Sequence, residues 1–137
     1  MIWLLPIAFA AGALCVLLLR RRSILITVQG HSMSPTYFNG DRLVVRRQRD
    51  CQVGDVVVFK LSHPVPGAPP LLVKRVVAVA GDEVPQEVRH TVDDPKVPQG
   101  RFVVLGDNVR SLDSRSLGYI DTAAVLGVVV RRMSKTG

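Results

Sequence analysis

The sequence is poor in aromatic residues. Aromatic side chains make up 5% of the 137 residues, and the basic clusters Arg20–Arg22 and Arg46–Arg49 contain none on which nucleobases could stack. The net charge of +7 therefore favours an anionic membrane surface over nucleic acid as the partner. Valine supplies much of the 47% hydrophobic share, which favours β-strands. The length allows one folded domain with one core.

Cysteine and histidine are also scarce, and their positions predict neither a disulfide nor a metal site. Cys15 lies inside an apolar run and Cys51 lies well beyond it, so no structural disulfide is expected to join them. His31, His63 and His90 are scattered and share no ligand spacing with the cysteines. We expect no metal and no cofactor. The sequence does not indicate an oligomeric state.

Charge is absent from the start of the chain. Residues Ile2 to Leu19 carry no charged side chain, and as a helix they would span about 27 Å, close to the thickness of a bilayer's hydrocarbon core. A cleaved signal peptide is the alternative, since Ala8-Phe9-Ala10 resembles a cleavage site, but no Lys or Arg precedes the run. We predict a transmembrane anchor with a basic flank over residues 1–22 and a β-rich domain over residues 23–137.

The flanking charges bear on the orientation of this anchor. Arg20, Arg21 and Arg22 follow the apolar run and no basic residue precedes it. By the positive-inside tendency, the domain after the helix would lie in the cytoplasm.

The rest of the chain has the pattern of a strand-rich domain with surface loops. Gly40-Asp41 and Gly54-Asp55 each precede an apolar run, and we expect the two runs to form successive antiparallel strands. Proline-rich segments over residues 61–70 and 83–100 are expected to be loops, the second with short edge strands. The predicted strands are Ser23–Val28, Arg42–Arg46, Val56–Lys60, Leu71–Ala80, Arg101–Leu105 and Ala123–Arg131.

A polar, turn-prone segment, Gly30-His31-Ser32-Met33-Ser34-Pro35, follows the first predicted strand. Ser32 lies where an extended strand must break into a turn, so its hydroxyl can be exposed and rigid, as a nucleophile requires. An ordinary surface turn is the alternative. If the strand stays extended, Ile26, Val28 and Gly30 share one face with Ser32.

A nucleophilic serine needs a base, and histidine is poorly placed for this role. His31 is adjacent to Ser32 and would point to the opposite face, and no Gly-x-Ser-x-Gly motif is present. Lys74 lies among aliphatic residues that could lower its pKa by desolvation. Alternation places Lys74 and Arg75 on opposite faces, so one of these cations must enter the core, either as a base or as a buried cation paired with Asp.

A third polar segment runs from Gly106 to Gly118. Its many short polar groups beside a predicted strand suggest a hydrogen-bonded loop that positions another group, or an ordinary polar connection. Ser111 could hold an amine, and Asp113 with Arg115 could fix the loop.

Together these segments resemble the ordered motifs of type I signal peptidases, the S26 family. The motifs are Ser32-Met33-Ser34-Pro35-Thr36, Gly40-Asp41, Gly54-Asp55, Lys74-Arg75-Val76-Val77 with Gly81-Asp82, Val97-Pro98-Gln99-Gly100 leading into Gly106-Asp107-Asn108, and Ser111-Leu112-Asp113-Ser114-Arg115. They cover nearly the whole domain after the helix. Two residues separate Asn108 from Ser111, where family members usually have three.

The resemblance implies a Ser/Lys dyad protease with an all-β catalytic fold and one N-terminal transmembrane helix. It implies Ser32 as nucleophile, Lys74 as general base and Ser111 as the residue that orients the lysine amine. Asp113 and Arg115 would form a structural salt bridge. The Ser32 backbone N–H would donate to the oxyanion. Some members add a serine hydroxyl two residues before the nucleophile, where this chain has Gly30.

The resemblance further implies that the protein removes signal peptides from exported preproteins, with the active site on the exported side and the membrane lipid nearby. Arg20–Arg22 are contrary to this orientation. The family cleaves after small residues at −1 and −3. We expect Ile26, Val28 and Val73 to wall the pockets for them. Met33, which supports the nucleophile, is expected either to reach the lipid surface with its neighbours Tyr37 and Phe38 or to pack in the core.

Two other functions fit parts of the pattern. One is a dedicated maturation or self-processing protease that uses the same dyad, although such proteases usually lack a membrane helix. The other is an inactive, membrane-anchored module that binds signal-like peptides, against which the retention of both Ser32 and Lys74 argues.

Overall fold

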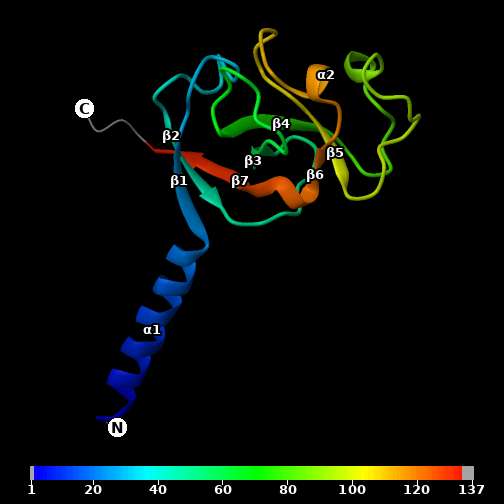
Figure 1. The fold of residues 1–137 in the computed structure, drawn as a ribbon. Coiled ribbons are helices and arrows are strands. Elements are labelled where there is room, and N and C mark those ends of the chain that lie inside the picture. The colour runs from blue at the N-terminus through cyan, green and yellow to red at the C-terminus, as the bar shows by residue number, and fades with distance from the viewer. Residues whose placement is uncertain (1, 134–137) are drawn as a thin grey trace.

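A computed structural model describes residues 2–133 of the chain. Met1 of the predicted anchor and residues 134–137 of the predicted β-rich domain lie outside the described residues. One long helix leads into a domain built mostly of antiparallel β-strands that curl into a half-barrel (Figure 1). The helices are α1 (Leu4–Arg21) and α2 (Ser114–Leu117), with 3-10 turns η1 (Gln86–Val88) and η2 (Thr122–Ala124). The strands are β1 (Ser23–Thr27), β2 (Arg42–Arg46), β3 (Val56–Lys60), β4 (Leu71–Val79), β5 (Arg101–Leu105), β6 (Ile120–Asp121) and β7 (Val125–Arg132).

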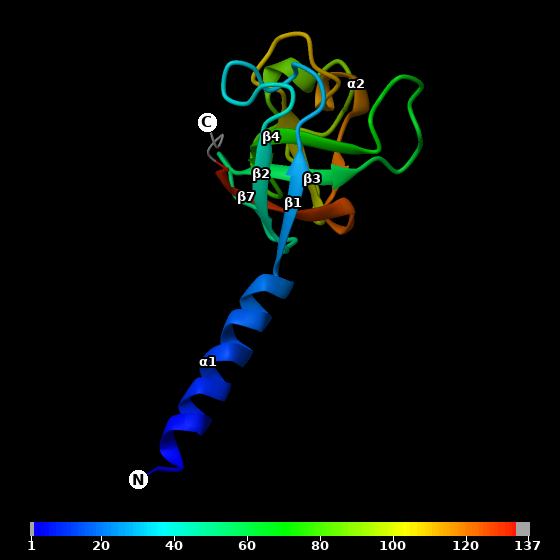
Figure 2. The ribbon, with the colours of Figure 1, turned by 90° about the vertical axis from the view of Figure 1, so that its left-hand side faces the viewer.

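Helix α1 projects away from the β-domain and packs on no core (Figures 1 and 2). None of its residues is buried, and its mean hydropathy of 1.8 over 18 residues gives it the length and apolar character to cross a membrane. An isolated apolar cylinder of this kind is stable only in an apolar surrounding or against another apolar surface. The chain enters β1 directly after it, with Arg22 at the junction.

The strand order is β1-β2-β7-β3-β4-β5-β6, and every neighbouring pair is antiparallel. The C-terminal strand β7 is therefore inserted between β2 and β3. The prediction that β2 and β3 form successive antiparallel strands is wrong, because both pair with β7 and not with each other. A pairing with the far end of the chain leaves no local signal in the sequence.

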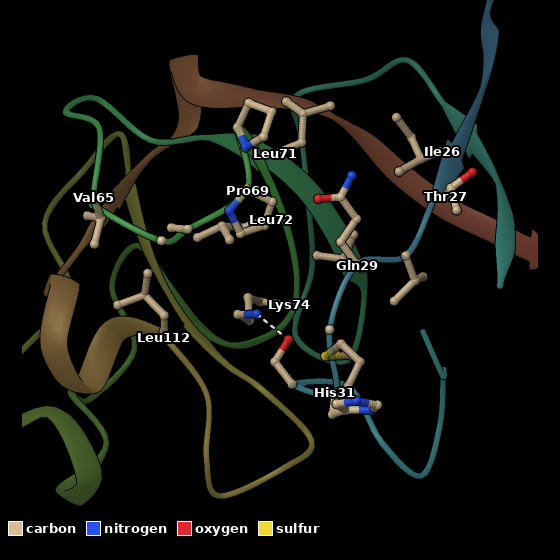
Figure 3. Close-up of a pocket in the computed structure, with 18 of the residues that line it drawn as sticks. Ile26, Thr27, Gln29, His31, Val65, Pro69, Leu71, Leu72, Lys74 and Leu112 are labelled. Carbon is tan, nitrogen blue, oxygen red and sulfur yellow. Dashed lines mark hydrogen bonds between the residues drawn. The ribbon is translucent and has the colours of Figure 1, made fainter. Parts of the chain in front are cut away.

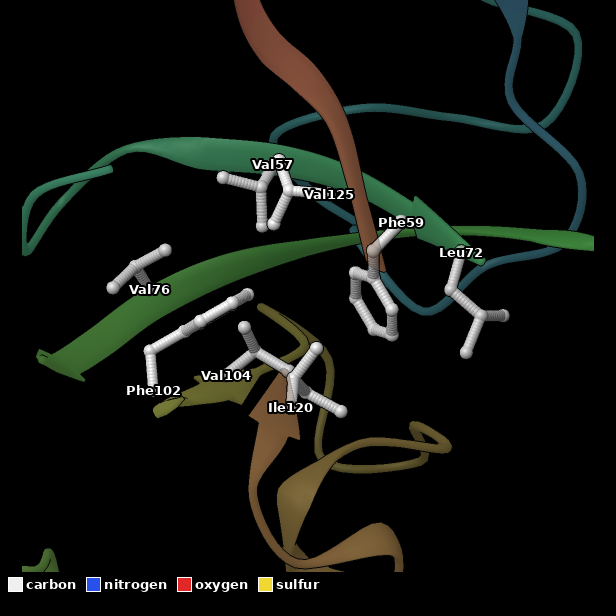
Figure 4. Close-up of a cluster of buried hydrophobic side chains, with 8 residues drawn as sticks. All are labelled: Val57, Phe59, Leu72, Val76, Phe102, Val104, Ile120 and Val125. Carbon is white, nitrogen blue, oxygen red and sulfur yellow. The ribbon is translucent and has the colours of Figure 1, made fainter. Parts of the chain in front are cut away.

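The core lies on both sides of the sheet, because the curled strands face apolar side chains on each surface. In β3 the four residues Val56–Phe59 are all buried. Phe59 packs with Phe102 and Ile120 in one cluster (Figure 4), whereas Val58 joins Met33 and Leu43 in another. The loop between β4 and β5 closes a third cluster, since Val84, Val88 and Val97 pack on Ala78 and Val103.

Candidate active site

The turn that carries Ser32 begins earlier than expected. Strand β1 ends at Thr27, and Gly30 has a φ of +85°, a left-handed conformation that glycine adopts without steric cost. The chain is therefore not extended up to Ser32, and the expectation that Gly30 continues the alternating face of β1 to Ser32 is wrong. Residues 32–36 form tight turns, in which Met33 O accepts from Thr36 N–H and Tyr37 N–H, each at 2.9 Å.

Met33 anchors this turn from the inside. Its side chain is 1% exposed and packs with Val28, Leu43 and Val58. Of the two environments expected for it, the structure shows the core and not the lipid surface. Tyr37 also packs against this cluster, whereas Phe38 remains 48% exposed. An anchored turn holds the half-buried Ser32 in place without covering its hydroxyl.

Strand β4 carries Lys74 to the same point. Alternation along β4 turns Leu72, Lys74 and Val76 inward, so Lys74 is 2% exposed. Its Nζ lies 2.6 Å from Ser32 Oγ (Figure 3). Burial lowers the Lys74 pKa from 10.5 to about 8, although the negative charge of Asp113 partly opposes the shift.

This pair has the geometry of a nucleophile and its base. A charged amine at 2.6 Å donates to the hydroxyl oxygen, whereas a neutral amine offers a lone pair that can accept the Ser32 proton. The lowered pKa makes the neutral amine accessible near neutral pH. The arrangement can therefore support attack of Ser32 Oγ on a carbonyl carbon. Within residues 2–133 no group of three His, Cys, Asp or Glu side chains could hold a metal ion.

Asp113 and Arg115 form the predicted ion pair, with Arg115 Nη2 2.7 Å from Asp113 Oδ2. Asp113 is fully buried and caps α2 by accepting from Arg115 N–H at 3.1 Å, and it also accepts from Gly106 N–H at 2.7 Å. Burial by itself raises the Asp113 pKa, but the hydrogen bonds from Arg115 and Gly106 outweigh it and hold that pKa below its usual value. The ion pair ties the loop after β5 to α2.

Ser111 lies beside the dyad but makes no hydrogen bond to it. Its Oγ is buried and has no hydrogen-bond partner within residues 2–133. A Cβ on Gly106 would overlap the Ser111 side chain and lie 2.7 Å from the Ser32 carbonyl oxygen. Gly106 is therefore the point of close approach between the loop after β5 and the turn that carries Ser32, a role that the sequence reasoning did not assign to it.

A second ion pair joins the three segments of the site, and the sequence reasoning missed it. Arg75, next to Lys74, binds Asp107 with Nε to Oδ1 at 2.9 Å and Nη2 to Oδ2 at 2.8 Å. Thr36 donates to the same carboxylate, and Asn108 N–H donates to the Ser32 carbonyl at 2.9 Å. The hydrogen bonds from Arg75 lower the Asp107 pKa. Alternation put Arg75 on the face opposite Lys74, but no local pattern indicated that the polar loop after β5 would bring Asp107 to it.

A groove of about 630 Å³ runs past the dyad. The predicted pocket residues Ile26, Val28 and Val73 all line it, together with Ser32 and Lys74. The opposite wall, visible in Figure 3, comes from the proline-rich loop and the loop after β5, and the sequence reasoning did not place it. The residues of that wall are Val65–Pro70 and Leu112.

The backbone N–H groups of Gly30 and Ser32 differ in their hydrogen bonding. Gly30 N–H donates to Asn39 Oδ1 at 2.9 Å and is therefore occupied. Ser32 N–H donates no hydrogen bond to any group in the described part of the chain. The Ser32 N–H is therefore unpaired in the described residues and could donate to a bound group.

The comparison with known proteins bears directly on this site. The family model described as "Signal peptidase, peptidase S26" matches residues 1–91 and 85–134. The chain belongs to the signal peptidase S26 family. This is a family of serine peptidases, and it implies preprotein substrates; together with the apolar helix α1 it suggests anchoring in a membrane.

The relatives of this chain include both mitochondrial and bacterial proteins. Mitochondrial inner membrane protease subunit 1 of Schizosaccharomyces pombe is 32% identical over 111 residues, an alignment covering 76% of this chain and 69% of the relative. Signal peptidase IB of Staphylococcus aureus is 29% identical over 145 residues, covering 75% of this chain and 73% of the relative. The similarity thus extends over most of each protein.

Proposed function

We propose that this protein is a membrane-anchored serine endopeptidase that removes signal peptides from exported preproteins after small residues at −1 and −3. The observation that carries the proposal is the 2.6 Å approach of the buried Lys74 Nζ to Ser32 Oγ. A module that only binds peptides has no need of a buried, unpaired lysine against a serine hydroxyl, because desolvating a cation costs free energy. The S26 family membership supports the same reading.

In the proposed mechanism neutral Lys74 accepts the Ser32 proton while Oγ attacks the scissile carbonyl carbon. The Ser32 N–H stabilises the oxyanion, and the protonated lysine then donates its proton to the leaving amine. Water, deprotonated by Lys74, hydrolyses the resulting ester between Ser32 and the substrate. Ser111 would hold the amine by turning its unpaired hydroxyl toward Nζ. Asp113 and Arg115 would fix the loop that presents it.

The groove supports extended peptide substrates with small side chains near the dyad. Val28 and Val73 are buried aliphatic residues beside Ser32 and Lys74, and Ile26 lies farther along the same wall. We assign to them the shallow pockets for the −1 and −3 residues. The β-domain would lie on the exported side of a single-pass anchor.

The test is cleavage of a preprotein with an Ala-x-Ala site by the full-length protein in detergent. We expect Ser32→Ala and Lys74→Met each to abolish cleavage, because one removes the nucleophile and the other the base. Methionine fills a similar volume and removes the cost of burying a charge, so Lys74→Met should unfold at a temperature no lower than the native protein. Full activity in either folded variant would refute the dyad. A reporter fused after Gly137 that is active only in the cytoplasm would overturn the exported-side assignment.

A further inference from the structure

Two arginine clusters that are separate in the sequence meet where the helix joins the β-domain. The β1–β2 register places Ser23 opposite Arg46, and Arg47 N–H donates to the Arg22 carbonyl at 2.6 Å. Figures 1 and 2 both show the segment after β2 beside the upper end of α1. We call the arginines gathered here the arginine collar: Arg20, Arg21, Arg22, Arg46, Arg47 and Arg49.

The charges of the arginine collar have no partners in the part of the chain that the structure describes. All six residues are exposed, and none of their side chains makes an ion pair or hydrogen bond within residues 2–133. Of the carboxylates next in the sequence to Arg46–Arg49, Asp50 is exposed and Asp55 accepts from Gln52 N–H at 2.9 Å. Asp41 Oδ2 lies 3.5 Å from Arg132 Nη1. By contrast, Arg75, Arg101 and Arg115 each have a carboxylate partner.

The arginine collar lies at the end of a helix that can cross a membrane. The surface that it would meet is therefore that of the membrane. A helix of this length places its last residues at the level of the lipid headgroups. Guanidinium groups bind phosphate oxygens through paired hydrogen bonds and are attracted to an anionic leaflet. We propose that the arginine collar binds the phosphate headgroups of anionic phospholipids at the membrane surface.

This contact has a consequence for the groove. The collar belongs to the end of β1 nearest the helix, and the groove begins on the same strand at Leu25. Binding of Arg46, Arg47 and Arg49 to lipid would hold the β1–β2 ribbon against the membrane at a second place besides the helix. The domain then cannot swing freely about the Arg22 junction, and the mouth of the groove stays near the bilayer surface.

The test measures association of spin-labelled lipids with the full-length protein in bilayers of phosphatidylcholine, by electron paramagnetic resonance. We expect spin-labelled phosphatidylglycerol to associate several-fold more strongly than spin-labelled phosphatidylcholine, and high salt to abolish the preference. The variant Arg47→Gln/Arg49→Gln should lower the several-fold preference to less than about half of its native value, because each basic residue near the surface adds to the attraction for anionic lipid. The matched control Lys60→Gln/Lys96→Gln, which removes two exposed charges elsewhere, should leave it unchanged.

Equal association of the two lipids with the native protein would overturn the proposal, and so would an equal loss in the control variant. Competition by inorganic phosphate beyond that of chloride at the same ionic strength would also overturn it, by showing a site for the free anion. Circular dichroism confirms that each variant is folded. Because lipid association is measured without substrate, the result is independent of the proposed peptidase activity.

Discussion

The pH dependence of cleavage follows from the burial of Lys74. Lowering its pKa from 10.5 to about 8 raises the neutral fraction at pH 7 from roughly 0.03% to roughly a tenth. If neutral Lys74 is the base, kcat/KM should rise with pH through a midpoint of about 8. It should fall about tenfold for each pH unit below that midpoint and level off above about pH 9.

The assay uses a peptide substrate with an Ala-x-Ala site and no group that titrates between pH 5 and pH 10. In parallel, the Lys74 pKa can be measured by NMR on protein with 13C-labelled lysine, since the chain has four lysines and the Lys74 signal is identified by its loss in Lys74→Met. Agreement of the kinetic midpoint with the NMR midpoint supports Lys74 as the base. A kinetic or NMR midpoint near 10.5, or the same rising profile in Lys74→Met, would refute it.

Two substitutions test how the loop after β5 holds the dyad. Gly106→Ala should lower kcat at least about tenfold, because its Cβ would overlap Ser111 and displace the Ser32 carbonyl, whereas Gly12→Ala, where a Cβ meets nothing within 4 Å, should leave the rate unchanged. Arg75→Lys should lower kcat more than it changes KM, because lysine cannot make both hydrogen bonds to Asp107. Arg101→Lys, whose ion pair is half exposed, is the matched control, and equal effects of the two lysine variants would contradict the positioning role.

Local patterns were sufficient for most strands and for the burial of a cation in β4. Arg42–Arg46, Val56–Lys60 and Arg101–Leu105 match the prediction at both ends because turn residues bound apolar runs there. Alternation within β4 required either Lys74 or Arg75 to enter the core, and the structure shows that Lys74 is the buried one.

Features that depend on contacts between distant parts of the chain could not be predicted from local sequence patterns. The insertion of β7 between β2 and β3 joins segments far apart in the chain, and the short β6 and α2 have too few residues to show a period. Gly30 broke the assumed alternation because its positive φ is a property of the fold around Asn39 and not of the local apolar pattern. The pairing of Arg75 with Asp107 likewise needs β4 and the loop after β5 to be placed together.

The position of Asp113 raises a physical problem that Arg115 solves. A carboxylate buried near Lys74 favours the charged amine, and it does oppose the lowering of the Lys74 pKa. Arg115 places its guanidinium on the same carboxylate with two hydrogen bonds, at 3.0 and 2.7 Å, and its positive charge offsets much of that field. Asp113 can then hold the loop through Gly106 N–H without keeping Lys74 protonated. In the proposed mechanism the ion pair therefore serves the chemistry as well as the fold, because it permits a rigid loop beside an amine that must lose its proton.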